Sequence, residues 1–166
     1  MDPELTAAEL VLAIRACCDD PKYWLTVVAS LVKEGSLKPM PTTRRGTGHR
    51  RRFSPTEARI AAVLFELKAM GLHHVQIGHV SQILRNGLED MPGFRERWEA
   101  AADGKPMPIF IMPATPTANR GFGSDELPWV QVDSDSYFRG AKGLFKLELA
   151  SIFKEIELPK LEETET

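Results

Sequence analysis

The stretch SLKPMPTTRRGTGHRRRFSPT, residues 36–56, separates two helical patterns and concentrates positive charge in one place. It holds six Lys or Arg residues and no acid, whereas the 166-residue chain has a formal net charge of -2, so the other 145 residues carry -8. Like charges held this close repel one another, so the cluster indicates a polyanionic partner, with DNA as the first candidate. The cations are Lys38, Arg44, Arg45, Arg50, Arg51 and Arg52.

Glycines and prolines within this stretch argue against a helix. Two short extended arms, about 37–45 and 49–53, predict a β-ribbon or "wing" instead. Ser54, Pro55 and Glu57 then supply a helix cap, a first-turn proline and the glutamate of a capping box. A ribbon that ends against a capped helix can hold arginines beside a duplex.

Two helices are predicted before the ribbon. The first spans 5–16, because Thr6 and Glu9 have the capping-box spacing. The second spans 22–34, with Asp20 as its cap, Pro21 at its first position and Gly35 as its stop. Its apolar face is predicted at Leu25, Val28, Leu31 and Val32.

Two more helices are predicted after the ribbon. One spans 55–70 and ends at Gly71, and the other spans 74–86. Both carry apolar residues at helical spacing, which predicts a buried face for each. These residues are Ile60, Val63, Leu64 and Leu67 in the first, and Ile77, Val80, Ile83 and Leu84 in the second.

The composition changes after Arg85. A turn-rich linker at 86–93 precedes a short helix at 94–103, and strands are predicted at 106–113, 127–134 and 144–149. A helix at 150–158 follows the last strand. The alternative is a single helix over 143–157, because Phe145, Leu149, Ile152, Phe153 and Ile156 also fit a helical stripe.

The predicted fold class is mainly α with small β, a winged helix-turn-helix domain at 1–86 followed by a small α/β segment. A linker and short helix at 87–105 join this domain to the α/β segment at 106–158, and an acidic tail covers 159–166. No apolar run has the length of a membrane helix, and the start of the chain lacks a signal-peptide pattern, so the expected location is the cytoplasm. Adjacent cysteines, Cys17 and Cys18, are expected to be reduced thiols.

The order of elements over residues 31–84 resembles the DNA-binding domain of MerR-type transcriptional regulators. The resemblance is carried by LVKEGSLKP at 31–39, by GHRRRFS at 48–54 and by the helix that ends at Gly71-Leu72. Three features differ: Ala29, Ser30 and Leu31 stand where the family has Arg-Tyr-Tyr, the 71–84 segment is longer by about three residues, and no long dimerisation helix follows. The resemblance implies a bacterial-type winged helix-turn-helix regulator.

In such a protein the second helix reads DNA while the wing holds the backbone. We expect a homodimer on a palindromic double-stranded site, since two-fold symmetry doubles the base pairs that one small reader covers. The expected DNA contacts are Lys22, Tyr23, Thr26, Lys33, Lys38, Arg44, Arg45, His49, Arg50, Arg51 and Arg52. The expected dimer contacts are Ile109, Phe110, Ile111, Trp129, Leu144 and Phe145.

Other function classes are weighed against this one. An excisionase-like factor that bends DNA for a recombination enzyme, or a protein-docking module on a winged-helix scaffold, remains open. Enzyme activity is not expected, because the chain lacks GxSxG, P-loop, HExxH and GxGxxG motifs. No metal or cofactor is expected either, because His73, His74 and His79 lack ligand spacing. A small-molecule or protein effector is left unassigned.

Overall fold

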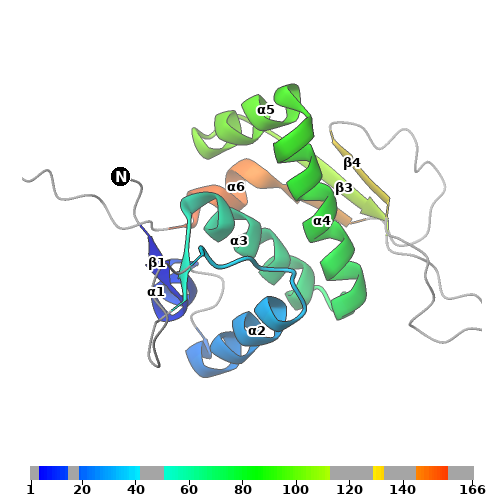
Figure 1. The fold of residues 1–166 in the computed structure, drawn as a ribbon. Coiled ribbons are helices and arrows are strands. Elements are labelled where there is room, and N and C mark those ends of the chain that lie inside the picture. The colour runs from blue at the N-terminus through cyan, green and yellow to red at the C-terminus, as the bar shows by residue number, and fades with distance from the viewer. Residues whose placement is uncertain (1–3, 15–18, 42–50, 113–128, 133–144, 157–166) are drawn as a thin grey trace, which may run out of the picture.

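The computed structural model describes residues 4–14, 19–41, 51–112, 129–132 and 145–156. The fold is mainly helical with a few short antiparallel strands, which confirms the coarse fold class. Helix α3, Pro55–Ala69, runs through the middle of the molecule, with α2, Pro21–Lys33, below it and α4, His74–Asp90, beside it (Figure 1). The predicted starts of all three helices are therefore confirmed to within one residue.

The first predicted helix is shorter than expected. Leu5–Thr6 form strand β1, and helix α1 covers only Ala7–Ala13. The predicted capping box is confirmed, since the Glu9 amide donates to Oγ1 of Thr6 over 3.3 Å and the Thr6 amide donates to Oε2 of Glu9 over 2.7 Å. Leu5 is drawn into a strand because it pairs with Phe53 of strand β2, Arg52–Phe53, a contact that local sequence does not reveal.

Helix α2 begins and ends within one residue of the prediction, and most of its predicted apolar face packs on the core. Asp20 caps it by accepting from the Tyr23 amide over 3.1 Å. Val27, Val28 and Leu31 are buried, whereas Leu25 is 37% exposed. Val28 and Leu31 of the predicted face are therefore confirmed as buried and Val32 packs against the core, whereas the prediction for Leu25 is wrong.

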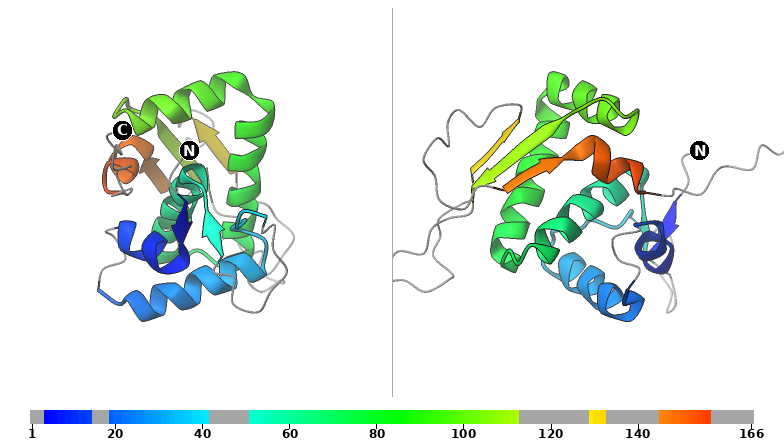
Figure 2. Two further views of the ribbon diagram at one scale, coloured as in Figure 1. Left: turned by 60° about the vertical axis from the view of Figure 1, so that its left-hand side comes forward. Right: turned by 180° about the vertical axis from the view of Figure 1, so that it is seen from behind.

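Helix α3 is the centre of the core. The predicted residues Ile60, Val63, Leu64 and Leu67 are buried, and Ala58, Ala61, Ala62 and Phe65 are buried with them. A helix that is apolar nearly all round must be covered on most sides. Here α2, α4 and α6, Leu149–Lys154, provide that cover (Figures 1 and 2).

The predicted linker at 86–93 is wrong. Helix α4 continues to Asp90, and α5, Pro92–Ala102, follows after Met91 alone. Gly87 lies inside the helix and does not break it. Its missing side chain leaves room for the Phe94 ring of the next helix. Ile83 is 37% exposed, so its predicted burial is also wrong, and Leu88 extends the buried face instead.

Replacing Gly87 with alanine is expected to destabilise the fold by about 1–2 kcal/mol, although alanine is the better helix former. A Cβ at this position would lie 2.9 Å from Cδ1 of Phe94, whose ring stacks on Trp98 with centroids 6.1 Å apart. Gly93→Ala is the matched control, because no atom lies within 4 Å of its added Cβ. Urea unfolding measures both, and an equal stability for the two variants would contradict the tight crossing.

The C-terminal part forms a three-stranded antiparallel sheet in the order β4-β3-β5. Its strands are β3, Pro108–Met112, β4, Trp129–Val132, and β5, Phe145–Glu148. Strand β5 leads directly into α6, so the predicted strand-then-helix arrangement is confirmed and the single helix over 143–157 is wrong (Figure 2). Ile109, Ile111 and Leu147 share the face that enters the core.

One hydrophobic core joins the two predicted domains. It extends from Leu5 to Phe153 and includes residues of every helix. Trp98 of α5 is completely buried and meets the Phe153 ring of α6 edge-on, with centroids 4.7 Å apart. The predicted domain boundary at residue 86 lies inside α4. The helices and the sheet instead pack around one shared core.

Glu66 of α3 links stability to pH. Burial raises the pKa of its carboxyl above the usual 4.5, and the charge of Glu155 raises it further. The folded chain then holds this proton more tightly than the unfolded chain. The bound proton therefore stabilises the fold fully below pH 4.5, and this stabilisation is lost as pH rises through the raised pKa.

Glu66→Gln should therefore raise the Tm at pH 7 by about 1–2 °C, because partly exposed positions change stability by at most about 0.5 kcal/mol. Thermal unfolding at pH 4 and pH 7 checks this, and the gain should shrink at pH 4. Glu96→Gln, at an exposed position of α5, is the control. A gain that is equal at both pH values would contradict the prediction.

Candidate nucleic-acid interface

The basic segment, residues 36–56, is anchored at both of its ends. We call Ser36–Met40 its stem. Gly35, with a φ of 78°, reverses the chain after α2, and the amides of Ser36 and Leu37 both donate to the Leu31 carbonyl, over 2.8 and 3.0 Å. Leu37 is buried in the core. The predicted helix stop at Gly35 is confirmed, and it directs the stem away from α2.

A buried ion pair, Glu57–Arg85, holds the stem in place. Nη1 and Nη2 of Arg85 donate to the two carboxylate oxygens of Glu57, over 2.7 and 2.5 Å. Nη2 also donates to the Ser36 carbonyl over 2.9 Å, and the Lys38 amide donates to Oε1 of Glu57 over 2.6 Å. Both side chains are less than a tenth exposed. The pair therefore bonds to the stem main chain on either side of Leu37.

Helix α4 adds a second bond to the same carbonyl. The Ser81 hydroxyl donates to the Ser36 oxygen over 2.6 Å, and a Cβ added at Gly78 would lie 3.3 Å from Oγ of Ser36. The stem is thus pressed against α4 where that helix carries its smallest side chains. The Ser36 carbonyl, which leaves water here, therefore accepts two hydrogen bonds, as buried polar groups require.

Glu57 does not complete the predicted capping box. The Ser54 hydroxyl accepts from the Glu57 amide over 3.2 Å, so the cap at Ser54 is confirmed. The Glu57 carboxylate, however, is occupied by Arg85 and Lys38. A local motif with the right spacing was overridden by a long-range ion pair.

The two predicted arms of the wing meet at one described point. The Met40 amide donates to the Arg52 carbonyl over 2.8 Å. Strand β2 forms its two-residue ladder with β1, so the pairing differs from a simple hairpin between 37–45 and 49–53. The tip, residues 42–50, lies outside the described residues.

Helix α2 presents a polar stripe to solvent. Lys22, Thr26, Ala29, Ser30 and Lys33 are exposed and follow helical spacing along one side. The three central side chains are small, so the helix backbone can approach a flat or grooved partner closely between two lysines. The Ser30 hydroxyl donates to Glu34 over 2.8 Å, which places one carboxylate at the C-terminal end of the stripe.

Tyr23 is held in a fixed direction by a chain of aromatic rings. Its ring meets Trp24 edge-on at 5.3 Å, and Trp24 packs on Phe65 of α3 at 4.7 Å. Tyr23 itself is 48% exposed. Trp24 therefore packs against α3, and an exposed tyrosine lies beside it in the first turn of α2.

Seven of the expected DNA contacts are described, and all seven are exposed. One of them has an acidic neighbour, because Nη1 of Arg52 lies 3.6 Å from Oε2 of Glu4. An exposed pair of this kind is worth about 0–1 kcal/mol and is readily exchanged for a phosphate. The seven are Lys22, Tyr23, Thr26, Lys33, Lys38, Arg51 and Arg52, whereas Arg44, Arg45, His49 and Arg50 lie outside the described residues.

Three of the expected dimer contacts are buried inside the protein and are not exposed to a partner. Ile109 and Ile111 are completely buried within one chain, and Phe110 is nearly so. We therefore correct the prediction for these three residues, because their side chains already pack inside the protein. Trp129 and Phe145 lie in β4 and β5, and Leu144 lies outside the described residues.

Two of the three described histidines lie at the start of helix α4. His73 is the N-cap of α4, and His74 is the first residue of that helix. Within the described parts of the chain, no group of three His, Cys, Asp or Glu side chains could hold a metal ion. Cys17 and Cys18 lie outside the described residues. No helix in the described ranges combines the length and the apolar character that crossing a membrane requires.

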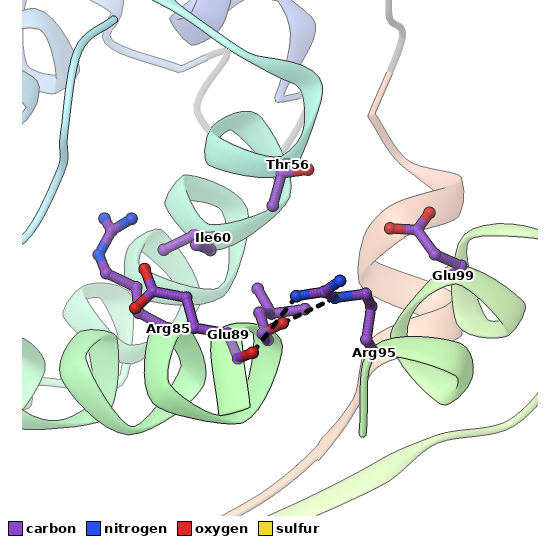
Figure 3. Close-up of a pocket in the computed structure, with 7 residues that line it drawn as sticks. Thr56, Ile60, Arg85, Glu89, Arg95 and Glu99 are labelled. Carbon is purple, nitrogen blue, oxygen red and sulfur yellow. Dashed lines mark hydrogen bonds between the residues drawn. The ribbon is translucent and has the colours of Figure 1, made fainter. Parts of the chain in front are cut away.

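A surface cavity of about 290 Å³ lies between α3, α4 and α5 (Figure 3). Its charged lining is largely used by the protein itself. Nε of Arg95 donates to the Leu88 carbonyl over 2.7 Å, Arg59 pairs with Glu99 at 2.7 Å, and Arg85 holds Glu57. The cavity therefore offers few uncommitted polar groups to a ligand, and its residues mainly join α4 to α5.

No family profile matches the chain, and no curated protein matches it significantly. Sequence reasoning missed Ser36, Ser81 and Arg85 as parts of the candidate site. One signal was present, since Arg85 lies beside Leu84 and Leu88 on the inward side of α4, where a charge needs a buried partner.

Proposed function

We propose that this protein binds double-stranded DNA through α2 and the basic segment and regulates transcription as a homodimer. The observation that carries the proposal is an exposed, lysine-flanked helix α2 that leads through the Gly35 turn into the anchored stem of the cationic segment. Helix α2 has the size and polar stripe that suit a major groove, while arginines of the segment suit phosphate oxygens or a narrow minor groove.

The arrangement of elements supports a MerR-like winged helix-turn-helix. Helices α1 and α2 precede the basic segment, whose far end pairs with β1 through β2, and α3 and α4 follow it. The stem leaves α2 at Gly35, so reader and segment are joined by a rigid turn rather than a linker. A partner with two adjacent anionic tracks, as in duplex DNA, fits such a pair.

Selection of bound duplexes from a random pool tests the proposal. The expected result is a shared inverted repeat whose half-sites lie about one helical turn apart, since a symmetric dimer reads both halves. Lys22→Ala combined with Lys33→Ala should weaken binding to the recovered sites. Lys105→Ala with Lys154→Ala, at exposed positions away from α2, removes the same charge and should have little effect.

The possible outcomes separate the remaining functions. Absence of binding to any duplex at low salt would overturn the proposal and favour a protein-docking module. Bound duplexes without a shared sequence, together with DNA bending in a circular-permutation assay, would favour the architectural, excisionase-like role. A recovered motif without symmetry would retain DNA reading and remove the homodimer.

A further inference from the structure

The buried Glu57–Arg85 pair does more than fill the interior between α3 and α4. Of the hydrogen bonds described above, one from each partner goes to the stem of the basic segment, at the Ser36 carbonyl and the Lys38 amide. These two main-chain groups lie on either side of Leu37, whose side chain is buried. The stem is thus fixed at three successive residues.

A buried ion pair is an inefficient way to stabilise a protein. Removing two charges from water costs several kcal/mol, and apolar replacements of similar volume are often equally stable or more so. The retained benefit is a defined direction, because a bidentate Arg–carboxylate pair tolerates little rotation. Here the pair fixes the direction of the stem, because it is hydrogen-bonded to the main chain at Ser36 and Lys38.

We infer that Glu57 and Arg85 are positioning residues that set the direction of the basic segment relative to α2, an inference that rests on the proposed DNA-binding function. Neither side chain reaches the partner, since both are buried. They act through Ser36 and Lys38, and Ser81 supports them at Ser36. With the stem fixed, the arginines and the α2 stripe engage the duplex together; with the stem loosened, each binds without the help of the other.

The decisive variant combines Glu57→Leu with Arg85→Met. Both charges disappear together, so no uncompensated charge stays buried, and the Ser36 carbonyl keeps its bond from Ser81. We expect a Tm within a few degrees of the wild type, a loss of DNA affinity of about tenfold or more, and a shallower salt dependence, by about 0.9 in the log–log slope for each phosphate lost. A wild-type affinity and slope in this variant would overturn the inference.

Amide hydrogen exchange gives a readout that does not depend on DNA. The Lys38 amide, which donates to Glu57, should exchange at least about tenfold faster in the double variant. The Leu37 amide, which donates to the Leu31 carbonyl, should be unchanged. Unchanged exchange at Lys38 would show that the pair does not hold the stem.

A second variant keeps the test open to refutation if the first fails to fold. Ser81→Ala retains the ion pair and removes one bond to the Ser36 carbonyl, so a smaller loss of affinity with an intact fold is expected. An unchanged affinity in Ser81→Ala, with the double variant unfolded, would also count against positioning. If the wild type binds no duplex, the proposed function fails first, and that result differs from a variant that binds as the wild type does.

Discussion

Replacing Arg50, Arg51 and Arg52 together with alanine is expected to reduce DNA affinity by about 10²–10³-fold at 0.1 M salt while leaving the fold intact. Each phosphate that a cation neutralises adds about 0.9 to the log–log salt slope, so the loss of three contacts should flatten it by about 2.7. Arg51 and Arg52 are exposed, and the Arg52–Glu4 pair at 3.6 Å contributes little to stability. Binding measured over a series of salt concentrations gives both quantities.

A matched control separates local contact from net charge. Lys105, Lys146 and Lys154 are exposed in the C-terminal half, and their triple replacement with alanine removes the same charge. Equal loss of affinity in the two variants would mean that the affinity for DNA depends on the total charge of the protein and not on the basic segment. An unchanged slope in the arginine variant would remove these three arginines from the interface altogether.

The caps of α1, α2 and α3 and the ends of α2 and α3 were predictable because their signals are local. Thr6, Asp20 and Ser54 cap their helices within three residues, and Gly35 and Gly71 take the positive φ that ends α2 and α3. Charge is equally local, so the cationic segment was visible at once. These features need no knowledge of what lies across the core.

The errors arise where contacts with residues far away in the sequence determine the local structure. Gly87 reads as a breaker in isolation, yet Phe94 on the next helix fills the space that its missing side chain leaves. Leu5 fits a helix pattern until Phe53 pairs with it. Glu57 has the spacing of a capping box, but Arg85, 28 residues later, takes its carboxylate. Ile109 and Ile111 are apolar enough for an interface, and only the fold shows that the chain buries them itself.

The predicted interface combines both kinds of information. Lys22, Thr26 and Lys33 could be placed on one side of α2 from helical periodicity alone. Their relation to the cationic segment depends on the stem, and the stem depends on Glu57 of α3 and Arg85 of α4, whose pairing no local motif indicates. The sequence therefore indicated the groups that we propose to contact DNA, whereas the ion pair that we propose to orient them became visible only in the structure.

Arg85→Met alone is expected to destabilise the protein by about 3–5 kcal/mol, because it leaves the Glu57 carboxylate buried without a counter-charge. That is a large part of the roughly 5–15 kcal/mol that stabilises a typical domain, and it corresponds to a fall in Tm of about 6–20 °C for a chain of this size. Urea unfolding and calorimetry of the purified variant measure the loss.

Arg59→Met is the matched control, because Arg59 also forms a short ion pair, at 2.7 Å, with Glu99, whose side chain is 55% exposed. Water can solvate Glu99 once its partner is gone, so a loss of only about 0–1 kcal/mol is expected. The double variant Glu57→Leu with Arg85→Met should be more stable than Arg85→Met, although it differs more from the wild type. That reversal separates the cost of an unpaired buried charge from the worth of the pair, and a double variant less stable than the single one would mean that Glu57 and Arg85 hold the fold together more than they orient its basic segment.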